Sequence, residues 1–147
     1  MLTYSSRDIT TVDRGIIAHG VNCQGVMGSG VAKAIKEKWP IIYERYLELP
    51  TGKTMLGTAQ VVHINDFLYV ANCFTQVFYG HGGKFADPEA IRKSLDSVYK
   101  WGDYHDLDIY LPMIGCGLGG LNWEKDVEPI VRELDEQWER IDTYVCQ

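Results

Sequence analysis

Apolar positions along the chain follow two alternating periods, which is typical of short buried strands separated by amphipathic helices. Gly15 to Val21 is a short, mostly apolar run bounded by polar residues, and it predicts a buried strand. Val31, Ile35 and Trp39 then recur at four-residue spacing among lysines, which predicts an amphipathic helix. Pro40 ends this helix and can open a second short one, because a first-turn residue needs no N–H.

The middle of the chain predicts a hairpin followed by a long helix. Two β-rich runs between Thr58 and Thr75 flank Asn65-Asp66, a pair that suggests a hairpin turn. Asp87-Pro88-Glu89 combines an N-cap acceptor, a proline at the first position and a first-turn acid, so it predicts a helix start. One apolar face of that helix would consist of Ile91, Leu95, Val98 and Tyr99.

The C-terminal third predicts strand, helix and strand. Asp108 to Ile114 and Ile141 to Cys146 are the predicted strands. With Asp126 as N-cap, Pro129 falls in the first turn of the helix, where its missing N–H costs little. The apolar face of this helix comprises Trp123, Val127, Ile130, Val131, Leu134 and Trp138. Strands alternating with helices predict an α/β layered domain on a mostly parallel sheet, and without a linker or repeat we expect one domain over 1–147.

Composition excludes several classes of protein. Hydrophobic residues make up 46% and charged residues 23% of 147 residues, which is ordinary for a globular domain. The net charge of −6 argues against direct sequence-specific nucleic-acid binding. Neither a bilayer-length apolar run nor a signal-peptide pattern is present, so we expect a cytoplasmic protein without membrane contact.

The four cysteines indicate reduced thiols rather than a metal centre or a disulfide scaffold. No two of them form a CxxC pair, and none belongs to a cluster with zinc-ligand spacing. Carboxylate and histidine clusters are missing as well, so we expect neither a metal nor a cofactor.

Eleven of the fifteen glycines fall in three clusters, which marks loops where the backbone turns sharply or approaches something closely. Two clusters follow predicted strands, where ligands bind in parallel sheets. The clusters are Gly20, Gly25, Gly28 and Gly30; Gly80, Gly82 and Gly83; and Gly115, Gly117, Gly119 and Gly120.

The two clusters at strand ends predict a phosphate site. The loop from His19 to Ala32 leads through Gly28-Ser29-Gly30 into a helix start, where free N–H groups bind anions. Successive N–H groups of the loop from Ile114 to Leu121 can form a phosphate-binding concavity. Neither loop fits a Walker or dinucleotide motif. Each alone could be a tight turn, but the two together favour a diphosphate site.

The same segments resemble the macrodomain family. The motifs are HGVNCQGVMGSGVA at 19–32, a following Trp39-Pro40, FTQ at 74–76 and LPMIGCGLGGLNWE at 111–124. Asp8-Ile9-Thr10 matches an early family motif, with Arg7 in place of its usual glycine. The nearest branch holds the ADP-ribose 1″-phosphate phosphatases and the terminal ADP-ribose protein glycohydrolases. The resemblance implies a three-layer α/β/α fold with a central mixed, mostly parallel sheet.

The resemblance also implies binding roles. Asp8 would accept a hydrogen bond from the adenine amino group beside the Ile9 backbone, and Asn22 would orient the distal ribose. From the residues alone, Asp8 could equally be a solvated turn residue and Asn22 an Asx-turn former. The residues implied to wrap the diphosphate and distal ribose are Gly28, Ser29, Gly30, Val31, Ile114, Gly115, Cys116, Gly117, Leu118 and Gly119.

Candidates for catalysis are few. His19, at the entry to the first loop, is either a general acid/base or a hydrogen-bonded histidine that orders the loop. Cys23 and Cys116 have no basic sequence neighbour to activate a thiol. Phe78 and Tyr79 either line the distal ribose pocket or simply pack. The histidines interpreted as structural or surface residues are His63, His81 and His105.

Two departures from the family pattern limit the expected chemistry. The glycohydrolase subgroup has a catalytic lysine at the position of Gln76 and a catalytic aspartate at that of Gly119. We therefore expect binding of ADP-ribose and hydrolysis of ADP-ribose 1″-phosphate, with Asn22 and His19 placing a water. The alternatives are a non-catalytic ADP-ribose-binding module and, less favoured, removal of ADP-ribose from proteins or nucleic acid. We also expect Gly119 at the surface, where Gly119→Glu would block the ligand and leave the fold intact.

Overall fold

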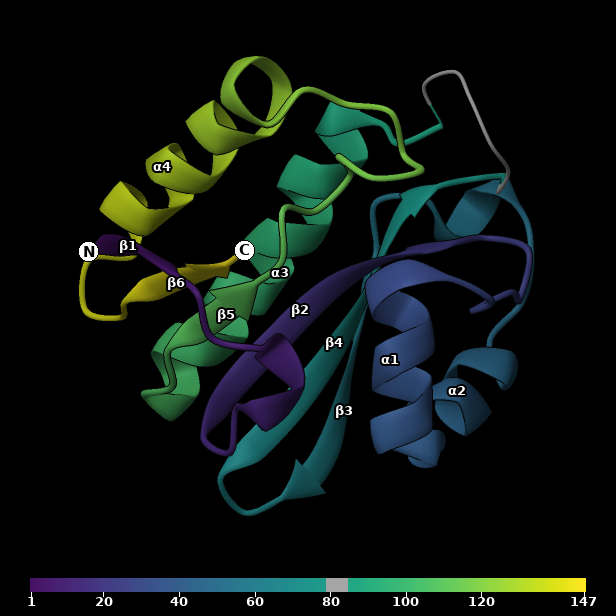
Figure 1. The fold of residues 1–147 in the computed structure, drawn as a ribbon, viewed down its shortest axis with the longest axis horizontal. Helices are drawn as coiled ribbons and strands as arrows, with labels where there is room; N and C mark the ends of the chain where they lie inside the picture. The colour runs from purple at the N-terminus through teal and green to yellow at the C-terminus, as the bar shows by residue number, and fades with distance from the viewer. Residues whose placement is uncertain (79–84) are drawn as a thin grey trace.

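The computed structural model describes residues 1–78 and 85–147, which form a six-stranded sheet between two layers of helices (Figure 1). The strand order is β1-β6-β5-β2-β4-β3, and every neighbouring pair is parallel except β3 and β4. This order confirms the mixed, mostly parallel sheet. The strands are β1 (Leu2–Ser5), β2 (Gly15–Asn22), β3 (Ala59–Asn65), β4 (Leu68–Gln76), β5 (Ile109–Leu111) and β6 (Thr143–Cys146).

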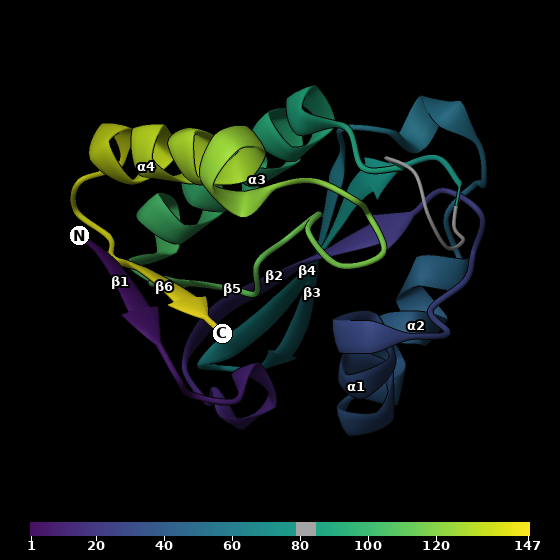
Figure 2. The same cartoon turned by 45° about the horizontal axis from the view of Figure 1, so that its top comes forward.

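Two helices cover each face of the sheet, which confirms the three-layer arrangement. Figure 2 shows α3 and α4 on one side of the strands and α1 and α2 on the other. The helices are α1 (Gly30–Lys38), α2 (Pro40–Leu47), α3 (Pro88–His105) and α4 (Glu128–Gln137). Shorter turns are η1 (Ile9–Thr11), η2 (Lys53–Met55) and the π-helical η3 (Trp123–Val127). No helix in the described ranges is long and apolar enough to cross a membrane.

The start of α3 follows the sequence prediction. The Asp87 side chain accepts the backbone N–H of Glu89, and Pro88 occupies the first turn. The four residues of the predicted apolar face are fully buried. Burial of each such large side chain contributes roughly 1.5–3 kcal/mol, so α3 is a principal anchor of the sheet.

The start of the last helix differs from the prediction, because Asp126 does not cap it. The Asn122 side chain accepts the Lys125 N–H, and Asp126 Oδ2 accepts the Asn122 N–H at 2.8 Å. This reciprocal pair works as a capping box widened by one residue to suit the π-helical turn. The helical path therefore begins at Trp123, and Pro129 still lies in the first turn of α4.

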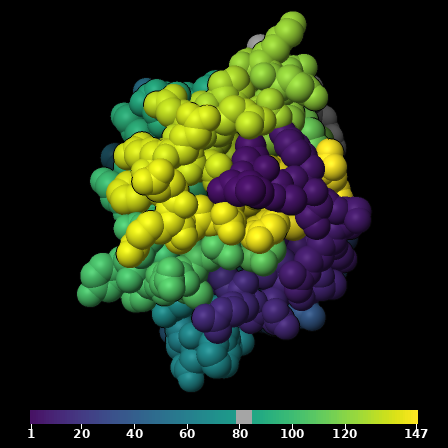
Figure 3. All heavy atoms as spheres, turned by 90° about the vertical axis from the view of Figure 1, so that its left-hand side faces the viewer, coloured from purple at the N-terminus to yellow at the C-terminus, as the bar shows by residue number. Residues whose placement is uncertain are grey.

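The ends of the sheet bring distant segments together. β1 pairs with β6, and Figure 3 shows the N-terminal segment lying against the C-terminal one at the surface. β5 stops at Leu111, short of the predicted Ile114, because the chain turns at Pro112 toward the second glycine loop. Because β1, β6, β5, β2 and β4 run parallel, the segments that follow them lie at one edge of the sheet.

Candidate functional site

A cavity of about 490 Å³ lies at that edge, between loop 1 (residues 23–29) and loop 2 (residues 112–122). Loop 1 joins β2 to α1, and loop 2 joins β5 to η3. The volume is in the range of small-molecule sites. Its position beyond the carboxyl ends of parallel strands is the one that the glycine clusters predict.

The structure brings together most of the residues that the sequence analysis selected. Those lining the cavity are His19, Asn22, Gly28, Ser29, Gly30, Val31, Ile114, Gly115, Gly117, Leu118 and Gly119. Asp8, Ile9 and Cys116 do not line it. Sequence reasoning missed lining residues such as Gly20, Met27, Thr75 and Met113. Their only signal is their position at a strand end or beside a glycine loop.

Every described side chain that lines the cavity is uncharged at neutral pH. Its titratable member is His19, whose imidazole is neutral as described below. Gln76 stands at the wall with its Nε2 donating to the Phe78 carbonyl at 2.7 Å. An anion in this cavity would therefore be held by neutral donors, chiefly backbone N–H groups and the start of α1.

Among the described residues, nothing requires two of the lining positions, Gly28 and Gly117, to be glycine. Within residues 1–78 and 85–147, a Cβ on Gly117 would meet nothing within 4 Å, and one on Gly28 would meet only Val26 Cγ1 at an ordinary 3.7 Å. Neither Gly28 nor Gly117 has a positive φ. Glycine at such positions would let a ligand approach the backbone closely.

Gly119 is different, and the expectation that it lies at an open surface is wrong. Its Cβ would come within 2.6 Å of the Gly115 carbonyl oxygen and 3.0 Å of Ala86 Cβ. The Gly119 carbonyl accepts N–H groups from Phe85 and Ala86 at 3.0 and 3.1 Å. Loop 2 is thus packed against residues 85–86, and it has no space for a side chain at position 119.

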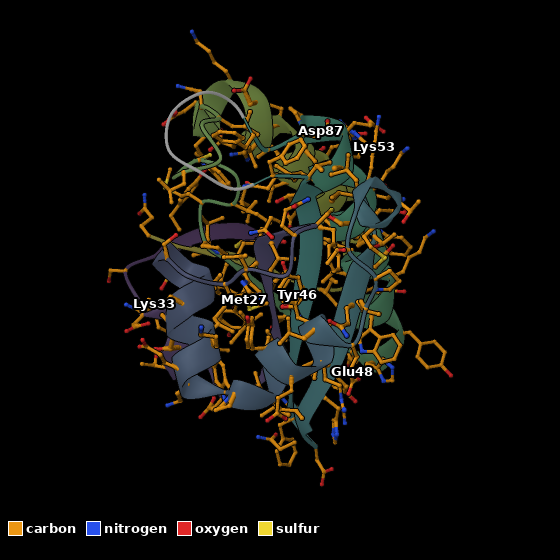
Figure 4. The ribbon with its side chains drawn as sticks, turned by 90° about the vertical axis from the view of Figure 1, so that its right-hand side faces the viewer. Met27, Lys33, Tyr46, Glu48, Lys53 and Asp87 are labelled. Atoms are coloured by element: carbon orange, nitrogen blue, oxygen red, sulfur yellow. The ribbon has the colours of Figure 1, made fainter. Side chains whose placement is uncertain are left out.

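Asn22 orders loop 1. Its Oδ1 accepts the Gln24 N–H at 2.9 Å, and its Nδ2 donates to the Val26 carbonyl at 2.8 Å. The first contact is an Asx turn. The buried Tyr46 hydroxyl donates to Asn22 Oδ1 at 2.9 Å, and burial raises the pKa of Tyr46 to about 12. Figure 4 shows Tyr46 and Met27 near the middle of this face of the molecule.

His19 is buried in β2 with one ring nitrogen bonded and the other unpartnered. Its Nε2 lies 2.6 Å from Asn72 Oδ1, while Asn72 Nδ2 donates to Gln60 Oε1 at 3.0 Å. Because Oδ1 must accept, Nε2 carries the proton and Nδ1 keeps a lone pair. Nδ1 is buried and has no partner among the described residues.

The electrostatics of His19 favour the ordering role over proton donation. Burial lowers its pKa to about 4, against a smaller raising effect of the Asn72 hydrogen bond. At neutral pH the ring is neutral and has no ionisable proton to give as a general acid.

The other candidate side chains are placed as follows. Burial, with nearby Asp126 and Glu124, raises the pKa of the Cys116 thiol to about 11, and burial alone raises the pKa of Cys23. Both thiols are therefore protonated at neutral pH and poor nucleophiles. His63 and His105 do not line the cavity, and both rings pack on the Tyr69 ring, with centroid-to-centroid distances of 5.2 and 5.8 Å. Tyr79, His81 and the glycines at 80, 82 and 83 lie outside the described residues.

Asp8 and Ile9 follow β1 at the same edge of the sheet. Asp8 caps η1, because its Oδ1 accepts from the Thr10 backbone N–H and hydroxyl at 2.9 and 2.8 Å. These bonds hold the pKa of the Asp8 carboxyl below its usual value. The ionised carboxylate is exposed, whereas Ile9 is buried.

Within the described ranges, no three His, Cys, Asp or Glu side chains are grouped to hold a metal ion.

The chain belongs to the Macro domain family, whose model matches residues 18–130. A DNA ADP-ribosyl glycohydrolase of Mycobacterium tuberculosis is 28% identical over 149 residues that cover 99% of this chain but 42% of that protein. An ADP-ribose 1″-phosphate phosphatase of Candida albicans is 28% identical over 134 residues, 82% of this chain and 81% of that protein. The macrodomain of Mycobacterium tuberculosis DarG has a TM-score of 0.83 at 26% identity, covering 99% of this chain and 97% of that one.

Proposed function

We propose that this macrodomain binds ADP-ribose in the cavity between loops 1 and 2 and slowly hydrolyses ADP-ribose 1″-phosphate. The observation that carries the proposal is the pair Gly28 and Gly117, because no contact among the described residues requires glycine at either position. Gly28 lies in loop 1 and Gly117 in loop 2, and both line the same cavity beside the start of α1. A diphosphate bridging the two loops would use both close approaches.

Hydrolysis of the 1″-phosphate needs little from the side chains. Water attacks phosphorus, the bond from phosphorus to the ribose oxygen breaks, and that oxygen must receive a proton. A phosphate monoester has a second pKa of about 6, so its own acidic oxygen can supply this proton. Backbone N–H groups of the loops would stabilise the developing charge, and the Asn22 amide would orient the water. We infer a slow reaction, because none of the described lining side chains is charged to assist it.

The alternative is an ADP-ribose-binding module without turnover, and the uncharged lining favours it. We do not extend the glycohydrolase activity to this chain. Gln76 cannot form a Schiff base and is tied to the Phe78 carbonyl. The Cβ of an aspartate at position 119 would lie 2.6 Å from the Gly115 carbonyl oxygen, so the loop as built has no space for that side chain.

Calorimetry with ADP-ribose, followed by phosphate release from ADP-ribose 1″-phosphate with and without a chelator, tests the proposal. Removal of ADP-ribose from a glutamate-modified protein is measured on the same preparation. Gly117→Glu should abolish binding by bulk and charge, whereas Ser97→Glu adds the same charge on an exposed part of α3 and should change nothing. The absence of binding heat at millimolar ADP-ribose would refute the binding site, and binding without phosphate release would leave the binding module.

A further inference from the structure

The buried hydroxyl of Tyr46 joins α2 to the start of loop 1. It donates to the Asn22 carbonyl at 2.6 Å and to Asn22 Oδ1 at 2.9 Å, and it accepts the Gly25 N–H at 3.1 Å. Because burial raises the pKa of Tyr46 to about 12, the hydroxyl keeps its proton at neutral pH. The Tyr46 ring packs against Phe74 of β4, with centroids 5.7 Å apart, so the hydroxyl is held at a fixed place beside the sheet.

Among the described residues, Tyr46 is the one partner of the Asn22 side chain that lies outside loop 1. The other contacts run to the loop backbone. Asn22 Oδ1 accepts the Gln24 and Val26 N–H groups at 2.9 and 3.4 Å, and Nδ2 donates to the Val26 carbonyl at 2.8 Å. The hydroxyl of Tyr46 therefore ties the Asn22 amide to the packed core rather than to the loop that the amide orders.

Loop 1 has further supports, but they act on other atoms. The Cys23 carbonyl accepts the Gly52 N–H at 2.8 Å, and the Met27 side chain is buried. These contacts hold the path of the loop backbone and involve no side-chain atom of Asn22. Loss of the Tyr46 hydroxyl should therefore leave the loop in place and loosen the Asn22 amide.

The hydrogen-bond capacity of the Asn22 amide determines what it can offer a ligand. An amide oxygen has two lone pairs, and the Gln24 N–H and the Tyr46 hydroxyl occupy them. The amide nitrogen has two N–H groups, and one of them donates to the Val26 carbonyl. Asn22 lines the cavity, so within the described structure it has one N–H left for a ligand and no acceptor. Such a group suits an oxygen of a ribose or a phosphate.

We propose that Tyr46 is a positioning residue, which holds the Asn22 amide so that its second N–H meets an oxygen of the bound ligand. The inference rests on the proposed ADP-ribose site and deepens it by naming the group outside the cavity that prepares this donor. Tyr46 does not line the cavity, so it acts through Asn22 rather than on the ligand. Without the hydroxyl, the amide would be ordered only on binding, and this cost would lower the affinity.

Amide hydrogen exchange without ligand tests the orientation of Asn22. The Gln24 amide bonds to Asn22 and not to Tyr46, so it reports on Tyr46 only through the Asn22 side chain. In Tyr46→Phe, which keeps the ring, it should exchange at least fivefold faster relative to the Ile91 amide of α3, which reports global stability. Tyr43→Phe is the matched control, because the Tyr43 hydroxyl donates to a carbonyl of the same loop at 3.3 Å and should not affect this rate. An unchanged Gln24 rate in Tyr46→Phe overturns the inference.

A double-mutant cycle, measured by calorimetry with ADP-ribose, tests whether Tyr46 acts through Asn22. Tyr46→Phe alone should raise the Kd about tenfold, and Tyr43→Phe should bind like the wild type. In the Asn22→Ala background no amide remains to be oriented, so Tyr46→Phe should raise the Kd less than twofold. Equal losses in both backgrounds overturn the inference, because Tyr46 would then support the cavity independently of Asn22. If the wild type binds no ADP-ribose, the proposed function fails, and the Gln24 exchange rates still decide whether Tyr46 orients Asn22.

Discussion

One added methyl group should have opposite effects at Gly117 and Gly119, two positions of the same loop. Gly119→Ala should destabilise the fold, because its Cβ would lie 2.6 Å from the Gly115 carbonyl oxygen. Gly117→Ala should leave the stability of the fold unchanged and weaken the binding of ADP-ribose. Its Cβ would contact no described residue and would instead occupy space proposed for the ligand. The two variants have the same chemistry and nearly the same place in the chain, so each serves as the control for the other.

The magnitude at Gly119 follows from the neighbours. The oxygen and the Ala86 Cβ at 3.0 Å belong to backbone and to a side chain without rotamers, so neither can turn aside. Relief requires a shift of loop 2 and strains the two bonds that Phe85 and Ala86 donate to Gly119. Overpacking of this kind costs typically 1–3 kcal/mol. For a domain of this size, each 1 kcal/mol lowers Tm by about 2–4 °C, so the fall should be roughly 2–12 °C.

Thermal unfolding followed by circular dichroism measures the first effect, and calorimetry with ADP-ribose measures the second. Gly117→Ala should melt within 1 °C of wild type by this reasoning, with affinity reduced at least tenfold, about 1.4 kcal/mol. If Gly119→Ala melts like the wild type, the packing of loop 2 described above is wrong. If Gly117→Ala binds normally, the ligand does not approach that backbone.

Three further outcomes are expected. ADP-ribose at one hundred times its Kd should stabilise the native state by ~2.7 kcal/mol, and an unchanged Tm would contradict the site. Asn22→Ala should slow phosphate release at least tenfold, about 1.4 kcal/mol of transition-state stabilisation, and should also loosen loop 1, which melting reports separately. The native pKa of His19, about 4, lies below its unfolded value of 6.5, so the unfolded state binds more protons between these values. Stability should therefore fall by up to about 3 kcal/mol as pH drops from 6.5 to 4, and His19→Gln should flatten this slope in denaturant titrations.

Much of the fold could be predicted because its signals are local. The proline and acid that open α3, the glycine clusters and the four-residue spacing in α1 act through neighbours in the sequence. The start of the last helix could not be located by the same means. Asn122 and Asp126 cap each other across a π-helical turn, and that turn departs from the period used to read the sequence.

The site was predictable in position but not in electrostatics. Glycine clusters after strands indicate where a ligand binds, and the structure adds which glycines are free of other constraints. The neutral state of His19 depends on Asn72 and Gln60, which approach it only when β2, β3 and β4 pair. Contacts between residues so far apart in the chain leave no pattern in a single sequence.

The uncharged lining of the cavity has a kinetic consequence. The chain carries a net charge of −6, and an ADP-ribose diphosphate is also negative, so the two repel at long range. Added salt screens this repulsion over distances near 10 Å at 0.1 M, and the association rate should rise with ionic strength. In the proposed complex the described lining offers the diphosphate dipoles rather than cations, so added salt would compete with few ionic contacts. Its dissociation rate should thus stay nearly constant, which is the reverse of what a lysine-lined phosphate site would show.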